Sequence, residues 1–308
     1  MTPDPRRIWL CADDYGAAPG VSAAIRDLIS QGRINATSVM VAAPHFSSEE
    51  AAGLAKLNAG QKRAALGLHV ALTGPLQPLS ASFSPLRHGR FLPLNTVLRL
   101  ATAHRLQPQP LADEIAAQLK KFMDMFGRPP DFLDGHQHVQ LFPQVRDAFL
   151  KVVAERAPTA WVRQCGRPRS GRRLRDHKAL VLDILSLGFR RRAKKLGIAF
   201  NPAFAGSYAL KSRANYARLF PHFLSGLPDG GLIMCHPGVV DAELKSLDSL
   251  TTLREQEFAF FGSDAFLQVL AEHNVALARP TSETRASTYL TPRKVKGGHN
   301  DPTGTPAS

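Results

Sequence analysis

The stretch of sequence that decides the fold is IWLCADDYG, which spans residues 8–16. Its apolar first half, residues 8–12, predicts a buried strand, and the polar residues after it mark the point where that strand gives way to a loop. The same succession recurs in GLH at residues 67–69 and in DGHQH at residues 134–138. We therefore expect three strands to bring two carboxylates and two or three imidazoles to one site.

Strand-like and helix-like segments alternate along the rest of the chain. The expected strands are residues 8–12, 37–42, 64–72, 131–134, 160–165, 197–201, 231–235 and 274–278, and the expected helices include 21–29, 113–126 and 253–270. This alternation predicts a mostly parallel sheet covered by helices. Seven or eight such units in 308 residues predict a closed or nearly closed α/β barrel, whose active site lies at the carboxyl ends of the strands.

The composition and the two ends of the chain predict how the barrel is organised. A hydrophobic content of 44% can fill one large core, so we expect a single domain over residues 1–285. Residues 75–110 are rich in Pro, Ser and Gln and predict a loop inserted over the site. Residues 286–308 predict a disordered tail. The apolar runs are shorter than the ~20 residues of a membrane span, and no signal peptide precedes the first strand, which predicts a cytoplasmic protein.

The net charge of +14 arises largely between Arg163 and Lys195. A solvated basic surface explains it, and so does attraction to an anionic substrate or an anionic membrane face. We expect no nucleic-acid partner, because aromatic residues do not alternate with the basic ones as a stacking platform requires. Phe189 and Leu196 flank the basic run 190–195, so this segment is either an ordinary solvated helix or a peripheral contact with the inner membrane surface.

The adjacent residues Asp13 and Asp14 are the first candidates for chemistry. Two neighbouring like charges repel, and one of them takes up a proton unless a cation intervenes. A divalent metal would remove the repulsion, and the bend from strand to loop lets both side chains reach one cavity. The alternative is structural: Asp14 caps the following helix and Asp13 pairs with an arginine.

The histidines extend this pattern. His69 follows an apolar run, where a lone histidine is either a ligand or a hydrogen-bonded core residue. His136 and His138 are two residues apart, so on an extended segment they face the same side, and Asp134 just before them can orient an imidazole. His236 follows another strand-like run and is a candidate general acid or a core histidine.

One carboxylate and two imidazoles, with positions left open, make a catalytic rather than a structural metal set. The same set matches the facial triad of non-haem iron oxygenases, which stays open as a second class of function. The second carboxylate favours hydrolysis, because it can take a proton from a metal-bound water.

Seven segments of the chain resemble the YdjC family of carbohydrate deacetylases, which includes the ChbG chitooligosaccharide deacetylases and the hopanoid-associated HpnK proteins. In chain order they are ADDYG (12–16), GVSAAI (20–25), TSVMV (37–41), GLHVALT (67–73), DGHQHV (134–139), MCHPG (234–238) and REQEF (254–258). The resemblance runs from Trp9 to Arg279. It implies a TIM-barrel-like fold and a homodimer that uses a divalent metal, Mg²⁺ or Zn²⁺, to remove the N-acetyl group from an oligosaccharide or a glycolipid.

The resemblance also implies a role for each matching residue. The metal ligands would be Asp14, His69 and His136. Asp13 would be the general base that activates water, and His236 would protonate the leaving amine. The implied substrate-binding residues are His138, Gln140, Tyr15 and Thr73.

Two positions depart from the family pattern. The family often carries a third histidine where this chain has Gln140. If that histidine only lines the sugar pocket, activity survives with altered specificity; if it is catalytic, this protein is slow, or a sugar-binding relative without activity. In residues 201–208, Pro202 replaces an acidic residue of the hopanoid-associated branch.

Overall fold

The computed structural model describes residues 4–168, 177–208, 215–247 and 252–279, with the backbone alone for 177–179. Its strands are β1 (Arg6–Tyr15), β2 (Ala36–Val39), β3 (Ala65–Val70), β4 (Phe132–Gly135), β5 (Trp161–Val162), β6 (Phe204–Ala205), β7 (Leu232–Cys235) and β8 (Val275–Leu277). The order across the sheet is β5-β4-β3-β2-β1-β7-β6, and β8 pairs with the first half of β1. All pairings between these strands are parallel.

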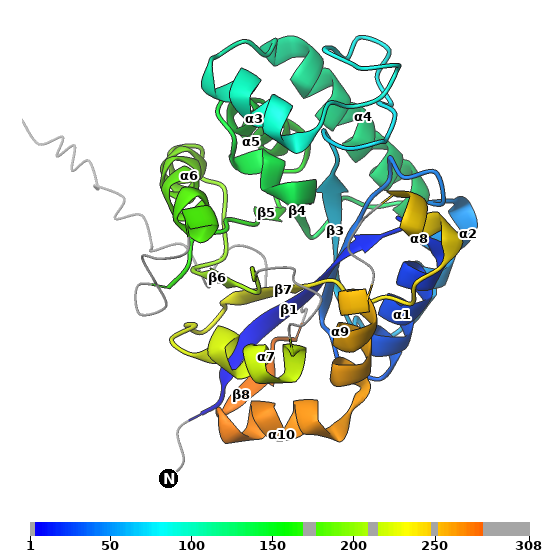
Figure 1. Cartoon of the computed structure of the whole chain (residues 1–308), viewed down its shortest axis with the longest axis vertical. Coiled ribbons are helices and arrows are strands. Elements are labelled where there is room, and N and C mark those ends of the chain that lie inside the picture. Colours follow the sequence, from blue (N-terminus) through cyan, green and yellow to red (C-terminus); the bar gives the residue numbers. More distant parts are fainter. Residues whose placement is uncertain (1–3, 169–176, 209–214, 248–251, 280–308) are drawn as a thin grey trace, which may run out of the picture.

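Helices surround this curled sheet, with α3, α4 and α5 gathered at one end of the molecule and α7 and α10 at the other (Figure 1). They are α1 (Pro19–Ser30), α2 (Ser48–Leu57), α3 (Leu94–Thr102), α4 (Pro108–Phe126), the 3₁₀ helix η1 (His136–Leu141), α5 (Val145–Arg156), α6 (His177–Lys195), α7 (Tyr216–Leu224), α8 (Ala242–Leu247), α9 (Thr252–Gly262) and α10 (Asp264–Glu272). In α4, the buried residues Ile115, Leu119 and Phe122 form the stripe that the sequence predicts.

The sheet nearly closes on itself through residues 199–205. Val162 of β5 forms a parallel bridge with Phe200, and the Phe204 amide donates to the carbonyl of Gly166 at 3.0 Å. The same stretch then continues into β6, which pairs with β7. The prediction of a nearly closed parallel barrel is therefore confirmed.

Strand β1 carries a bulge where the polar residues begin. Its register against β2 shifts between Ala12 and Tyr15, and Asp14 has a φ of 68°, in the left-handed region. A bulge re-aims side chains that regular alternation would send to opposite faces of the sheet. Asp13 and Asp14 are consequently both buried in the interior, each 2% exposed.

Packing between β3 and β4 explains the glycine of the GLH motif. Gly67 pairs in register with Phe132, and a Cβ on Gly67 would lie 2.4 Å from the phenylalanine ring. Only a residue without a side chain fits there. Two positions along, the same register brings His69 opposite Asp134.

Several element boundaries differ from the predictions. The expected strand 197–201 contributes only the single bridge at Phe200. The expected helix 253–270 is broken at Ser263, whose extended backbone ends α9 and begins α10. The expected loop 75–110 contains α3, which buries Val97 and Ala101 one helical turn apart.

The predicted tail, residues 286–308, lies outside the described residues. In the part of the chain that the structure describes, no helix combines the length and the apolar character needed to cross a membrane.

Candidate active site

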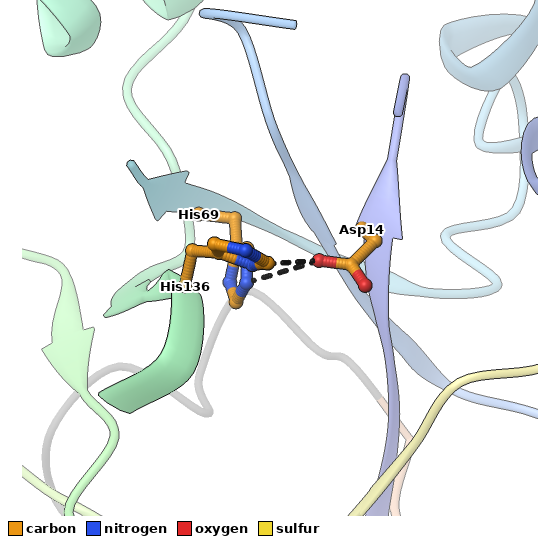
Figure 2. Close-up of side chains that lie close together, drawn as sticks. All are labelled: Asp14, His69 and His136. Carbon is orange, nitrogen blue, oxygen red and sulfur yellow. Dashed lines mark hydrogen bonds and ion pairs between the residues drawn. The ribbon is translucent and has the colours of Figure 1, made fainter. Parts of the chain in front are cut away.

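Three side chains from three separate segments meet at the carboxyl ends of the strands. Asp14 comes from the bulge in β1, His69 from β3 and His136 from the first position of η1. The carboxylate of Asp14 points at both imidazole rings (Figure 2). Its Oδ1 lies 3.4 Å from Nε2 of His69 and 3.2 Å from Nδ1 of His136. Their candidate ligand atoms all lie within 4.8 Å of one another.

These separations suit a bound divalent ion. Two ligand atoms that each lie about 2.1 Å from a tetrahedral zinc ion are about 3.4 Å apart. The two distances from Asp14 match that value, and one carboxylate oxygen with two imidazole nitrogens is a common donor set of catalytic metal sites. The residues therefore fit a metal that keeps coordination positions open for water and substrate.

A second carboxylate orients His69. Oδ1 of Asp134 lies 2.6 Å from Nδ1 of His69, and the Ser38 hydroxyl lies 3.1 Å from the same nitrogen. A metal-binding histidine commonly has its other ring nitrogen held in this way. Burial alone lowers the pKa of His69, but the Asp134 and Asp13 carboxylates outweigh burial and raise it to about 10. The Asp134 and Asp13 carboxylates therefore make a positive charge favourable beside His69, and a bound cation would supply one.

Asp13 is held by a buried arginine. The two terminal nitrogens of Arg163, which is fully buried, donate to its two oxygens at 2.7 and 2.8 Å. Arg163 also lies 3.0 Å from Oδ2 of Asp134. Burial alone raises the pKa of Asp13, but the Arg163 charge overcomes burial and lowers the pKa well below its usual value. Asp13 is therefore ionised, as the structural alternative for this residue predicted.

A second group of candidate ligands has its charge balanced by the same arginine. Cys11, Asp13 and Asp134 also bring candidate ligand atoms within 4.8 Å of one another. Arg163 already supplies the positive charge between the two carboxylates. Burial and the neighbouring carboxylates raise the pKa of the Cys11 thiol, so it stays protonated and is a poor ligand.

Another buried arginine holds the outer oxygen of Asp14. The Nη2 group of Arg254 donates to Oδ2 of Asp14 at 2.6 Å, which leaves Oδ1 facing the histidines. Burial alone raises the pKa of Asp14, and the Arg254 charge reverses that effect and lowers it well below its usual value. The predicted alternative of a helix cap is wrong, because the N-cap residue of α1 is Ala18 and no side chain caps this helix.

His236 directly follows β7, whose Cys235 pairs in register with Ala12, so His236 lies level with Asp13. Its amide donates to Oε2 of Glu257 at 2.5 Å, and the hydroxyl of Tyr208 donates to Oε1 of the same carboxyl at 2.6 Å. Burial raises the pKa of Glu257 to about 7. Glu257 therefore fixes the backbone that presents His236.

The raised pKa of Glu257 makes stability depend on pH. Because the folded protein binds this proton more tightly than the unfolded chain, stability falls as pH rises from about 4.5 to about 7, by on the order of 3 kcal/mol. We expect Glu257→Gln to remove this loss, because its amide oxygen can accept from the His236 amide and its NH₂ group can donate to the Tyr208 hydroxyl. Urea unfolding at pH 5 and pH 8 measures it, with Glu255→Gln on the exposed side of the same helix as control. An equal pH dependence in both variants would contradict the assignment.

The substrate-binding residues expected from the resemblance are distributed differently. The prediction that His136 and His138 share one face of an extended segment is wrong. The segment turns within η1 and is not extended, because Gln137 and His138 have positive φ values. His138 instead lies half-buried on another wall, with Nδ1 3.5 Å from the Cys165 sulfur and its ring edge-on to Phe204.

Gln140 and Tyr15 do not face the metal group. The turn of η1 buries Gln140, whose side-chain amide donates to the Arg163 carbonyl at 3.1 Å. Tyr15 is fully buried, and its hydroxyl donates to Glu50 and accepts from Arg26 at 2.8 Å. The geometry argues against substrate binding by either residue.

Thr73 is also buried after β3, with no hydrogen-bond partner for its hydroxyl among the described residues. Contact of Thr73 and His138 with the substrate stays a prediction.

Sequence reasoning missed the two arginines. Arg163 was counted as the start of the basic surface, yet it is fully buried. Its signal is a polar residue inside the expected strand 160–165, as His69 is inside the expected strand 64–72. Arg254 lies on α9 at the start of the segment REQEF, which the family resemblance includes but to which it gives no role.

Fold and site together define a parallel α/β barrel with an Asp-His-His group at the carboxyl ends of its strands. The chain belongs to the YdjC family, because the family model described as YdjC-like protein matches residues 7–272.

Characterised relatives and a solved structure resemble the chain over most of its length. A chitooligosaccharide deacetylase of Citrobacter koseri is 27% identical over 240 residues, which are 77% of this chain and 83% of that protein. A carbohydrate deacetylase of Clostridium beijerinckii is 25% identical over 279 residues, 88% of this chain and 97% of that protein. A crystal structure of a candidate cellobiose-phosphate cleavage protein from Enterococcus faecalis V583 has a TM-score of 0.67 at 19% identity, over 90% of this chain and 98% of that one. This last similarity supports the fold alone.

Proposed function

We propose that the protein is a metal-dependent hydrolase that removes the N-acetyl group from an N-acetylated sugar. The observation that carries the proposal is the convergence of Asp14, His69 and His136 beside a second, ionised carboxylate, Asp13. The two carbohydrate deacetylases similar to this chain support the reaction and the class of substrate.

Three residues would hold the metal: Asp14, His69 and His136. When bound, a divalent ion lowers the pKa of a water to about 7 and polarises the acetyl carbonyl. Two imidazoles favour Zn²⁺ over Mg²⁺, which prefers oxygen ligands, so we propose zinc. Arg254 on the outer oxygen of Asp14 and Asp134 on His69 would fix the orientation of two of the three ligands.

Asp13 would accept the proton of the attacking water. Its Oδ1 accepts from both Arg163 and the Ser38 hydroxyl. Its Oδ2 accepts from Arg163, and a carboxylate oxygen has a second lone pair for another donor, so Oδ2 is the oxygen that would take the proton. The lowered pKa keeps Asp13 ionised at neutral pH, as a proton acceptor must be, and also makes its carboxylate a weaker base. His236, level with Asp13 on the neighbouring strand, would donate a proton to the departing amine.

The replacement at Gln140 does not weaken this proposal. Gln140 supports the backbone at Arg163 and lies apart from the metal group, so a histidine is not needed there to complete it. We place the sugar beside His138, the half-buried histidine on the adjoining wall. The homodimer implied by the family stays a prediction.

Removal of the metal tests the proposal and separates it from an oxygenase. We expect chelation to stop acetate release from N-acetylglucosamine oligosaccharides, and Zn²⁺ to restore it to metal-stripped protein under nitrogen, because hydrolysis consumes no O₂. Release of acetate by the metal-free protein, or a reaction that needs O₂ and Fe²⁺, would contradict the proposal. Glycolipids that carry the same acetylated sugar, assayed in detergent, compare the two kinds of substrate.

A further inference from the structure

The outer face of α6 carries an exposed aliphatic row. Val181, Ile184 and Leu187 are 48%, 59% and 41% exposed, and Ile184 is the most exposed large hydrophobic residue in the described part of the chain. Residues three apart on a helix lie on the same side, so the three side chains form one surface. Exposing such a row to water is unfavourable, and a row of this kind is typical of a surface that contacts another protein or a membrane.

Basic residues continue this row toward the end of the helix. Arg191, Lys194 and Lys195 follow Ile184 by seven, ten and eleven residues, so they lie on the same side, and all three are exposed. The one acidic residue in α6, Asp183, is buried and bonded to Arg167. The face therefore pairs an apolar half with a cationic half, and α6 itself adds no exposed carboxylate to it.

The inner face of α6 is fixed to the wall of the candidate active site. The Ser186 hydroxyl accepts from the amide of Cys165 at 3.1 Å, and Arg190 donates to the side chain of Gln164 at 3.0 Å. Phe189 is fully buried, so it adds nothing to the exposed surface of the basic run 190–195 that it flanks in the sequence. The exposed aliphatic residues lie earlier in the helix, because α6 turns Phe189 inward onto Phe149.

We propose that the outer face of α6 docks on an anionic lipid surface. The aliphatic row enters the boundary between headgroups and acyl chains, and the three cations lie among the lipid phosphates. Charge complementarity selects this partner, since the face is cationic and the whole chain has a net charge of +14. Because one helix is only about 10–12 Å across, docking brings the membrane close to the wall that carries His138. The docking itself does not depend on the proposed deacetylase activity.

Vesicle flotation with the full-length protein tests the docking. We expect binding to vesicles of equal parts phosphatidylcholine and phosphatidylglycerol, little binding to phosphatidylcholine alone, and release at high salt. We expect Ile184→Ser with Leu187→Ser to weaken binding about tenfold or more. We also expect the triple variant Arg191→Ser, Lys194→Ser and Lys195→Ser to weaken binding by about a hundredfold, since each cation contributes roughly fivefold and the three factors multiply.

Matched controls change the same chemistry elsewhere on the surface. Leu267→Ser removes a leucine that is 47% exposed on α10, and serine at Lys56, Arg99 and Lys120 removes three exposed cations from other helices. Equal losses in the control and α6 variants, or undiminished binding by the α6 variants, would overturn the proposal. So would light scattering that shows the α6 variants abolishing a dimer while vesicle binding persists. An unchanged far-ultraviolet circular dichroism spectrum and melting temperature show that the α6 variants are folded, and this control does not depend on the proposed function.

Discussion

We expect Asp13→Asn to slow acetate release by ~10²–10⁴-fold, while the protein still binds its metal. Asparagine keeps the shape of the side chain but has no charge with which to accept a proton. The three proposed ligands are unchanged, so isothermal titration with Zn²⁺ is expected to give nearly the same stoichiometry. Single-turnover measurement of acetate release separates the chemical step from substrate binding.

The control for this variant is Asp183→Asn. Asp183 is also buried and also receives two bonds from an arginine, Arg167, but it lies outside the candidate site. It measures the effect of breaking such a pair without touching the proposed base. If Asp13→Asn loses no more activity than Asp183→Asn, Asp13 is not the base.

Arg163→Leu is expected to cost about 3–5 kcal/mol of stability in metal-free protein. The substitution leaves two buried carboxylates, Asp13 and Asp134, without the guanidinium that lies between them. The pKa of Asp13 then rises, because the Arg163 charge is what overcomes the effect of burial. Guanidinium chloride unfolding with chelator present measures the loss.

A double-mutant cycle identifies the cause of that loss. Adding Asp13→Asn to Arg163→Leu removes one of the stranded charges, so the double variant is expected to be more stable than the sum of the single effects predicts. Arg167→Leu, whose side chain is 15% exposed, is the matched control and is expected to lose less. Strict additivity in the cycle, or a loss below 1 kcal/mol for Arg163→Leu, would contradict the electrostatic explanation.

Most of the barrel could be predicted because its strands are short apolar runs with clear polar ends. The buried stripe of α4 could be predicted as well, because its apolar residues recur with helical periodicity. Periodicity could not identify the break at Ser263, because apolar residues on both sides of the break continue with helical spacing. The sequence also predicts a strand over residues 197–201 where the structure has one bridge, at Phe200. Local sequence does not reveal how many hydrogen bonds a neighbouring strand offers.

The candidate metal ligands could be predicted because each follows a strand, and parallel strands bring their carboxyl ends together. The path of the chain after β4 could not be predicted. Two consecutive residues, Gln137 and His138, adopt left-handed backbone conformations that are uncommon for such side chains, and this separates His138 from His136. The arginine partners were missed because a pairing across 150 residues, as between Asp13 and Arg163, leaves no local pattern.

The junction between β5 and β6 has a consequence for how the barrel moves. Both strands are two residues long, and the backbone contacts across this junction are the bridge between Val162 and Phe200 and the bond from the Phe204 amide to the Gly166 carbonyl. So few shared hydrogen bonds make it the place where amide protons should exchange with solvent by local opening rather than by global unfolding. Because Phe204 packs against His138, each such opening loosens the wall beside which we place the sugar. The barrel is thus expected to open locally along the junction between β5 and β6, beside the position that we propose for the substrate.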